Sequence, residues 1–248
     1  MAELSRKIFK VLRDYLVWTG YSVGTLMLSF WLAWQLSAQF NFLYPVWYSL
    51  LDIEQTVNQT MPKHLYKKEF IATNQQEHHR LFGEMVASIQ DHGNGLEDIV
   101  FLAPTGEAID VLLTESEVTH LQDVANLIDL LGWFALVIVI FCLMAFAAII
   151  FFRIPMPAIK TLISMLLFSV GAMVIGILIY GAKKFFYWLH TVIFPSEHQW
   201  FFYYEESLMS MLMQAPNLFA PISLMLLLIG IAIWVTHLML LRMIVGTK

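Results

Sequence analysis

The segment from Leu130 to Phe152, "LLGWFALVIVIFCLMAFAAIIFF", contains no Asp, Glu, Lys or Arg. About 20 such apolar residues suffice to cross a hydrocarbon core of ~30 Å as a helix. Three other stretches are equally free of charge, namely 15–51, 161–182 and 207–241. The sequence therefore predicts an all-α integral membrane protein with four transmembrane helices, at about 16–38, 130–152, 161–182 and 218–241.

The composition agrees with this class. Of 248 residues, 59% are hydrophobic and 13% are charged, whereas a soluble domain has about 25% charged residues. The continuous runs exclude a membrane β-barrel, whose strands alternate in hydropathy over ~10 residues. The first run also follows a basic flank, "SRKIFKVLRDY" (5–15), as a cleaved signal peptide would. It is longer than a typical apolar signal region of 7–15 residues and no small-residue cleavage site closes it, so a membrane anchor is favoured.

The distribution of Lys and Arg predicts the orientation. Positive residues gather at the N-terminus, between the second and third spans, and at the C-terminus, as Arg6, Lys7, Lys10, Arg13, Arg153, Lys160, Arg242 and Lys248. Since cytoplasmic segments are rich in Lys and Arg, we expect both termini in the cytoplasm. Residues 39–129 and 183–217 then form an extracytoplasmic layer, and residues 1–248 form a single membrane domain. Lys183 and Lys184 oppose the rule, and we interpret them as reaching phosphate head groups rather than substrate.

Cysteine content and charge exclude several classes of function. The single cysteine, Cys142, lies inside a span and cannot form an internal disulfide or a thiolate metal site. The net charge is -5 with neutral histidines and no basic tract is present, so nucleic acid is an unsuitable partner. No glycine-rich phosphate loop occurs, and no cofactor is predicted.

The extracytoplasmic layer contains recognisable local patterns. "EHHRLFGEMVASIQ" (77–90) has helical spacing, "DHGNG" (91–95) is a turn cluster, and "DIVFLAPTGEAIDVLL" (98–113) reads as short extended pieces around a turn. The aromatic side chains near residue 45 suit a membrane interface. These aromatic residues are Phe42, Tyr44, Trp47 and Tyr48. We expect the histidines of this loop to be solvated, namely His64, His78, His79 and His92.

A capping box opens the segment that leads into the second span. Thr114 and Glu117 have the T-x-x-E spacing in which the hydroxyl and the acid each satisfy a free backbone N–H. Glu117, His120 and Asp123 then recur every third residue on one helix face. We expect the Asp123 carboxylate to hold the imidazole of His120 in one tautomer.

A second polar segment, "HTVIFPSEHQWFFYYEE" (190–206), separates the last two spans. His190 follows four aromatic residues, Phe185 to Trp188, and Pro195 interrupts any helix there. His190 and His120 are thus both expected at the outer membrane interface, with His198 as the strongest rival to His190. The aromatic residues alternatively form an ordinary interfacial belt.

These two segments resemble the lipoprotein intramolecular transacylase family of bacterial membrane proteins. The family has an "E..HM.DV" pattern before its second span and an "FH..FF...W" pattern before its last. The resemblance covers essentially the whole chain, with Leu189 and Pro195 as departures. The matching positions here are Glu117, His120, Asp123, Val124, His190, Phe194, Trp200, Pro216 and Phe219.

The resemblance implies that an acyl chain moves from the glycerol of an S-diacylglyceryl cysteine to the α-amine of that cysteine, giving a lyso-form lipoprotein. An α-amine must lose a proton before it attacks an ester, and a histidine is a suitable base near neutral pH. We expect His120 to be the base, Asp123 to orient it, and His190 to serve as acid or oxyanion donor, although the two histidines can exchange roles. Substrate contacts are assigned to Trp188, Trp200, Tyr203 and Glu117.

The expected partners are diacylglyceryl-modified lipoproteins and membrane phospholipids, in the bacterial cytoplasmic membrane with the site on the extracytoplasmic face. Two alternatives remain. His120, Asp123, His190 and His198 offer donors for a zinc hydrolase, although no H-E-x-x-H motif exists. A non-catalytic lipoprotein-binding or assembly factor would instead tolerate loss of the histidines. A haem-binding subunit is disfavoured because His237 is the single histidine within a span.

Overall fold

The structure is a computed structural model that describes residues 2–245, without the side chains of residues 2–4, 6, 7, 159, 165 and 169. Lys248 and the side chains of Arg6 and Lys7, used in the orientation prediction, lie outside the described residues. The chain separates into two compact units. The first unit comprises Met1–Trp34, Gly132–Ile179 and Leu226–Lys248, and the second comprises Gln35–Leu131 and Tyr180–Met225. The orientation in the membrane stays a prediction, as does the description of residues 1–248 as a single domain.

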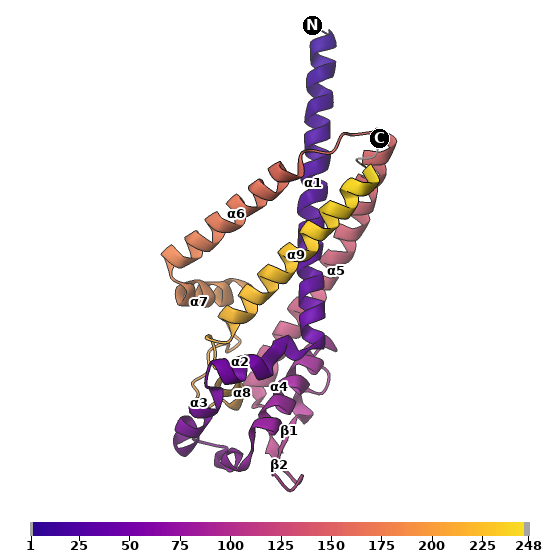
Figure 1. Ribbon diagram of the computed structural model, residues 1–248. Helices are drawn as coiled ribbons and strands as arrows, with labels where there is room; N and C mark the ends of the chain where they lie inside the picture. Colours follow the sequence, from indigo (N-terminus) through magenta and orange to yellow (C-terminus); the bar gives the residue numbers. More distant parts are fainter. Residues whose placement is uncertain (1, 246–248) are drawn as a thin grey trace. The chain divides into compact units, whose positions relative to one another are not determined.

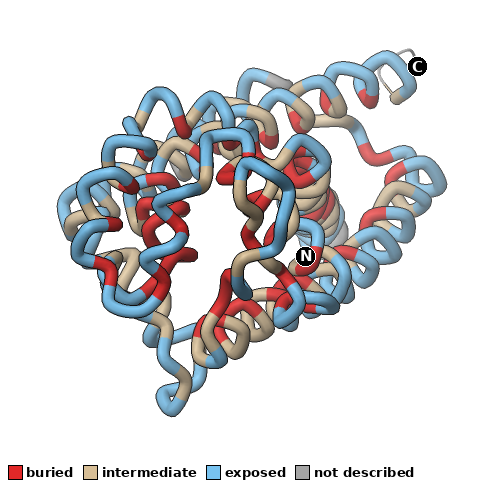
Figure 2. Tube along the Cα trace, turned by 90° about the horizontal axis from the view of Figure 1, so that it is seen from below, coloured by how far each residue is buried: buried red, intermediate tan, exposed pale blue. Residues whose placement is uncertain are grey.

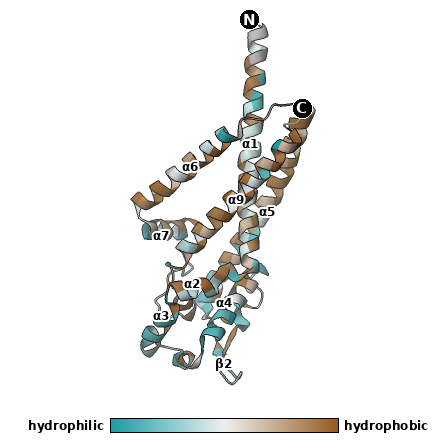
Figure 3. Ribbon diagram, in the orientation of Figure 1, coloured by the Kyte–Doolittle hydropathy of each residue, from teal (hydrophilic) through white to brown (hydrophobic). Residues whose placement is uncertain are grey.

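Among the residues that the structure describes, four helices are long and apolar enough to cross a membrane, which confirms the predicted number of spans. They are α1 (Ala2–Gln39), α5 (Glu115–Phe151), α6 (Ile159–Tyr180) and α9 (Phe219–Val245), labelled in Figure 1. Hydrophobic residues dominate α6, α9 and the later part of α5, whereas α3 and α4 carry many hydrophilic ones (Figure 3). At ~1.5 Å per residue, α5 is about 55 Å long, so its first turns extend beyond the charge-free part that begins at Leu130.

Side chains of α1, α5 and α9 pack together in the first unit. Trp18 and Tyr21 of α1 share a buried cluster with Cys142 of α5 and Leu241 of α9. A Cβ at Gly24 would lie 2.7 Å from the Sγ of Cys142, so this glycine permits close approach of the two helices, as small residues do in membrane bundles. The first hydrophobic segment is thus an integral part of the helical unit.

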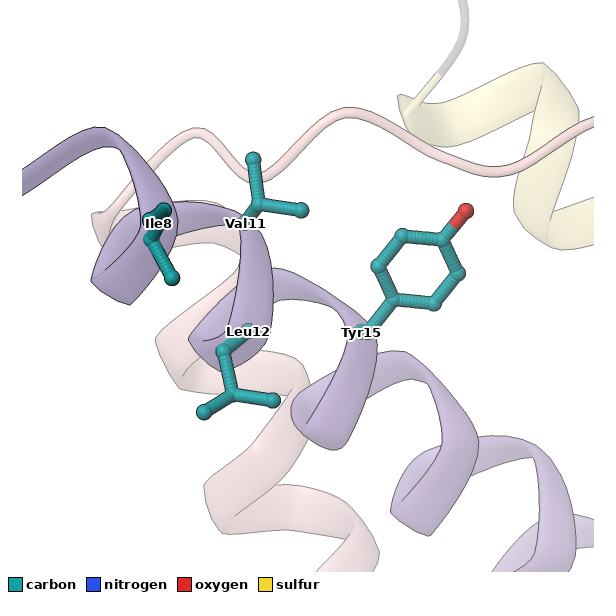
Figure 4. A pocket seen from close by; sticks show the side chains of 4 residues that line it. All are labelled: Ile8, Val11, Leu12 and Tyr15. Carbon is teal, nitrogen blue, oxygen red and sulfur yellow. The ribbon is translucent and has the colours of Figure 1, made fainter. Parts of the chain in front are cut away.

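Two further features of the first unit are structural. The Tyr21 hydroxyl lies 3.1 Å from Nε2 of His237, the histidine that lies within the fourth span. A hollow of about 370 Å³ beside the start of α1 is lined by Ile8, Val11, Leu12 and Tyr15 (Figure 4). Its lining offers apolar contacts and one phenol, and no acid–base pair.

The second unit is built from short elements. Its helices are α2 (Tyr44–Leu50), α3 (Ile53–Thr60), α4 (Gln75–Gln90), α7 (Ala182–Ile193) and α8 (Leu208–Leu212), with 3-10 turns at Asn41–Leu43, Met61–Lys63, Lys68–Ala72 and Leu96–Asp98. Strands β1 (Val100–Leu102) and β2 (Ala108–Val111) form an antiparallel hairpin in which Val100 faces Val111. The predicted helix, turn cluster and extended pieces are all confirmed. Buried and exposed positions, red and pale blue in Figure 2, alternate along the helices.

The expected interfacial position of Tyr44 and Tyr48 is wrong, because both are core residues of the second unit. Tyr44 is 0% and Tyr48 is 2% exposed. The Tyr44 ring stacks on Phe82 at a centroid separation of 3.9 Å, and its hydroxyl donates to the carbonyl of Leu212 at 2.7 Å. An aromatic residue with a polar tip can enter a core when that tip finds a partner, and sequence alone does not show the partner.

The expectation that His64 and His78 are solvated is also wrong, because they are buried, with 1% and 3% of their surface exposed. The Thr73 hydroxyl donates to the carbonyl of Phe70 at 2.6 Å, so it accepts from Nε2 of His78 at 2.8 Å. Nδ1 of His78 then accepts from the Tyr48 hydroxyl at 2.8 Å. Burial lowers the pKa of His78 to about 4, so the neutral ring is a structural link between α2 and α4.

Candidate functional site

The site is built on the first turns of α5, which the predicted capping box fixes in place. The N–H of Thr114 donates to Oε2 of Glu117 at 2.6 Å, and the N–H of Glu117 lies 3.4 Å from the Thr114 hydroxyl. The buried Ser207 hydroxyl, just before α8, donates to the other Glu117 oxygen at 2.5 Å. The cap therefore also ties α5 to the segment that begins α8.

Glu117, expected to contact substrate, is 1% exposed. Both of its carboxylate oxygens are engaged by Thr114 and Ser207. A buried carboxylate is retained only where such donors stabilise it. We therefore propose that Glu117 positions the helix carrying His120 rather than touching the lipid. Sequence reasoning missed Ser207, because a serine 90 residues away carries no local signal of this pairing.

The two predicted histidines meet in the second unit. The ring of His120 on α5 lies 6.1 Å from the ring of His190 on α7, measured between centroids. His120 is 9% exposed, and its Nδ1 is buried without a hydrogen-bond partner among the described residues. The geometry thus brings together two imidazoles that the sequence separates by 70 positions.

His190 is held in a defined tautomer. Its Nδ1 lies 2.8 Å from the carbonyl oxygen of Phe186, one helical turn earlier. A carbonyl can only accept, so Nδ1 carries the hydrogen and Nε2 of the neutral ring is free to accept a proton. Burial lowers the pKa of His190, while the bond to Phe186 acts in the opposite direction. The ring is therefore neutral and ready to act as a base at pH 7.

Aromatic rings surround the histidine pair. Measured between ring centroids, Phe194 lies 5.0 Å from His120 and 5.2 Å from His190, and Phe202 lies 6.0 Å from His120. Trp200, one of the expected substrate contacts, lies 5.1 Å from His190. An apolar enclosure of this kind suits an acyl chain and strengthens any hydrogen bond formed inside it.

The other two expected substrate residues lie further out on the surface. Trp188 is 48% and Tyr203 is 61% exposed. The Trp188 ring packs at a tilt against Phe185, and the Tyr203 ring packs edge to face against Phe201. Neither has a ring contact with His120 or His190 among the described residues, so a substrate role for them depends on the portion of the lipid that extends beyond the histidines.

The expected hydrogen bond between Asp123 and His120 is wrong. Asp123 lies one turn beyond His120, but its carboxylate oxygen is 2.7 Å from Nδ1 of His198. His198 lies in the loop after α7, 75 residues away in sequence. The spacing of two residues on a helix shows that they can meet, but not which third group competes for the carboxylate.

The geometry of these side chains does not support the alternative of a zinc hydrolase. Within residues 2–245, no three side chains of His, Cys, Asp or Glu converge as metal ligands do. Two of the donors proposed for it, Asp123 and His198, are hydrogen-bonded to each other. What the site offers is two facing imidazoles in an aromatic enclosure.

Comparisons with known proteins agree with the resemblance. The sequence profile of the lipoprotein intramolecular transacylase Lit matches residues 20–215. No curated protein matches by sequence. Two similar solved structures are of the membrane integral lipoprotein intramolecular transacylase Lit from Bacillus cereus, with a single histidine replaced by arginine in one and by alanine in the other. They superpose with TM-scores of 0.67 and 0.66, at 16% identity, over 99% and 98% of this chain and 98% of each of theirs.

The likeness to these structures at 16% identity shows the shared fold. The profile match spans most of the chain, from the first span through the histidine pair and the Asp123–His198 contact. The chain is therefore a membrane protein that belongs to the lipoprotein intramolecular transacylase family.

Proposed function

We propose that this protein moves an acyl chain from the glycerol of an S-diacylglyceryl cysteine to the α-amine of the same cysteine. The observation that carries the proposal is the pair of imidazoles, His120 and His190, with ring centroids 6.1 Å apart in an aromatic enclosure. The substrate supplies both nucleophile and ester, so the reaction requires no nucleophile from the chain. It requires a proton acceptor, a hydrogen-bond donor and an enclosure for lipid, and these are the groups gathered here.

The hydrogen bond from His190 to Phe186 supports roles opposite to those expected from sequence. With Nδ1–H donated to a carbonyl at 2.8 Å, Nε2 of His190 can take the amine proton, and the resulting imidazolium keeps its bond to Phe186. His120, neutral and buried, can donate to the oxyanion of the tetrahedral intermediate. His190 then returns the proton to the leaving glyceryl oxygen, as microscopic reversibility of acid–base catalysis allows.

Positioning supplies a second contribution. Amine and ester belong to one lipid-bearing residue, and intramolecular reactions in good attack geometry recover up to ~7–11 kcal/mol of the barrier. Phe194, Phe202 and Trp200 enclose the histidines and are suited to hold the acyl chain and glycerol in that geometry. The membrane phospholipids are proposed as the surrounding solvent and not as acyl donors.

Mass spectrometry of a diacylglyceryl lipopeptide incubated with the purified protein tests the proposal. Intramolecular transfer conserves every heavy atom, so the parent mass stays constant while fragmentation places one acyl chain on the amino terminus. A product lighter by one acyl group would indicate a hydrolase, and a heavier one would indicate transfer between molecules. An unchanged fragment pattern with retained lipopeptide binding would favour the non-catalytic alternative.

A further inference from the structure

The proposed reaction releases one proton, and the histidine pair alone does not dispose of it. The α-amine has a pKa of about 7.7–8.0, so it arrives largely as an ammonium ion at pH 7. Conversion of the ammonium and the ester into an amide and an alcohol removes two protons from nitrogen. One returns to the glyceryl oxygen, and the other must reach water on every turnover.

His120 and His190 are poorly suited to deliver that proton. His120 is buried, and Nδ1 of His190 is committed to the Phe186 carbonyl. Two imidazolium ions side by side would also repel each other, so the pair does not store a second proton. A third group that meets both the site and water is needed.

The structure assigns this task to His198. We propose that the Asp123–His198 pair is the proton outlet of the site, an inference that rests on the proposed function. Asp123 lies one turn from His120 on α5, and its carboxylate holds Nδ1 of His198 at 2.7 Å. The side chain of His198 is 37% exposed, whereas that of Asp123 is 14% exposed. The pair therefore reaches from the helix that carries His120 to the surface.

The surroundings of His198 favour exchange with water. Its neighbours Ser196, Glu197 and Gln199 are all exposed and polar. The Asp123 carboxylate on α5 holds the imidazole, and the other carboxylate nearby in sequence, that of Glu197, accepts from the Ser196 hydroxyl at 2.9 Å. A partly exposed imidazole that is bonded to a carboxylate on its inner side can pass a proton on to buffer.

Three variants separate an outlet from a merely structural contact. His198→Ala removes the imidazole. His198→Gln keeps an N–H donor for Asp123 but carries no exchangeable acid–base group. His92→Ala is the matched control, because the exposed His92 is held by Asp129 at 2.8 Å in the same way and has no contact with the histidine pair among the described residues.

The rate of acyl transfer is measured in dilute non-imidazole buffer and again with added imidazole. We expect both His198 variants to lose about tenfold in kcat, below the ~10²–10⁴ of a direct acid–base group. KM should be unchanged, and imidazole should restore the rate. His92→Ala should match the unsubstituted protein in both buffers.

Two outcomes would contradict the proposal that His198 carries the proton to water. One is full activity of His198→Gln in dilute buffer, which would show a positioning contact. The other is a loss in His198→Ala that imidazole does not restore. Both outcomes can be interpreted only if the unsubstituted protein forms the mass-neutral product. If the proposed function itself fails, the unsubstituted protein forms no such product, and this is observed before any variant is compared.

Discussion

Glu117→Ala is the substitution whose effect follows most directly from the contacts at the start of α5. Glu117 accepts from the Thr114 N–H at 2.6 Å and from the buried Ser207 hydroxyl at 2.5 Å. Loss of a helix cap costs about 1 kcal/mol. Loss of a buried hydrogen bond to a charged group costs about 1.5–3 kcal/mol. We therefore expect a loss of about 2.5–4 kcal/mol in the free energy of unfolding, from the sum of these two effects.

Denaturant titration of the protein in detergent micelles measures this loss. Glu117→Gln should cost about 1 kcal/mol, because glutamine also serves in a capping box. Glu115→Ala is the control in the same helical turn. Glu115 is exposed, so its removal affects only the helix dipole, by about 0.3–1 kcal/mol. The reasoning is refuted if Glu117→Ala destabilises no more than Glu115→Ala. A raised KM with unchanged stability would instead restore Glu117 as a substrate contact.

Three further predictions concern pH and metal. Because burial lowers the pKa of His190 below 6.5 and the amine titrates near 7.7–8.0, log kcat/KM should fall with a slope of about one below the amine pKa and of about two below that of His190. A slope of one over the whole pH range in which the protein stays folded would argue against a histidine base. His78 has a folded pKa of about 4 and an unfolded value near 6.5, so the unfolded state binds its proton first and stability is lost as pH falls from 6.5 towards 4. The loss at pH 5 should be about 2 kcal/mol, measured by denaturant titration, and His78→Gln should flatten this dependence. Dialysis against a chelator should leave the transfer rate unchanged, whereas a rate restored only by added zinc would revive the hydrolase alternative.

The spans and the start of α5 were predictable because their causes are local. The exclusion of charge from Leu130 to Phe152 reflects the cost of placing it in hydrocarbon. The Thr114–Glu117 box depends on residues three positions apart, which any helix start brings together. The turn between β1 and β2 depends on a similarly short stretch. Such patterns are visible in the sequence without knowledge of tertiary contacts.

The partners of the polar side chains were not predictable in the same way. Asp123 contacts His198 rather than His120, and Tyr48 contacts His78 on another helix. Each contact joins positions far apart in sequence, and several acceptors of equal chemistry compete for each donor. Burial of His78 follows from its contacts with Tyr48 and Thr73, because a histidine enters a core when its ring nitrogens are satisfied.

The roles that we propose within the histidine pair also depend on the structure. Sequence placed His120 and His190 at one interface but could not order them. The carbonyl of Phe186, one turn before His190, fixes the tautomer that makes Nε2 a proton acceptor. Any helical histidine has a carbonyl four residues earlier, so only the observed rotamer distinguishes a ring that uses it.

The central claim is that His120 and His190 act as one unit on the migrating acyl chain. Fragmentation mass spectrometry of a diacylglyceryl lipopeptide, with His120→Ala, His190→Ala and the double variant in equal folded amounts, tests it most directly. The account predicts that each single variant loses mass-neutral transfer nearly as completely as the double variant, because groups that act together are non-additive. Full transfer by His190→Ala, or losses that simply multiply in the double variant, would contradict it.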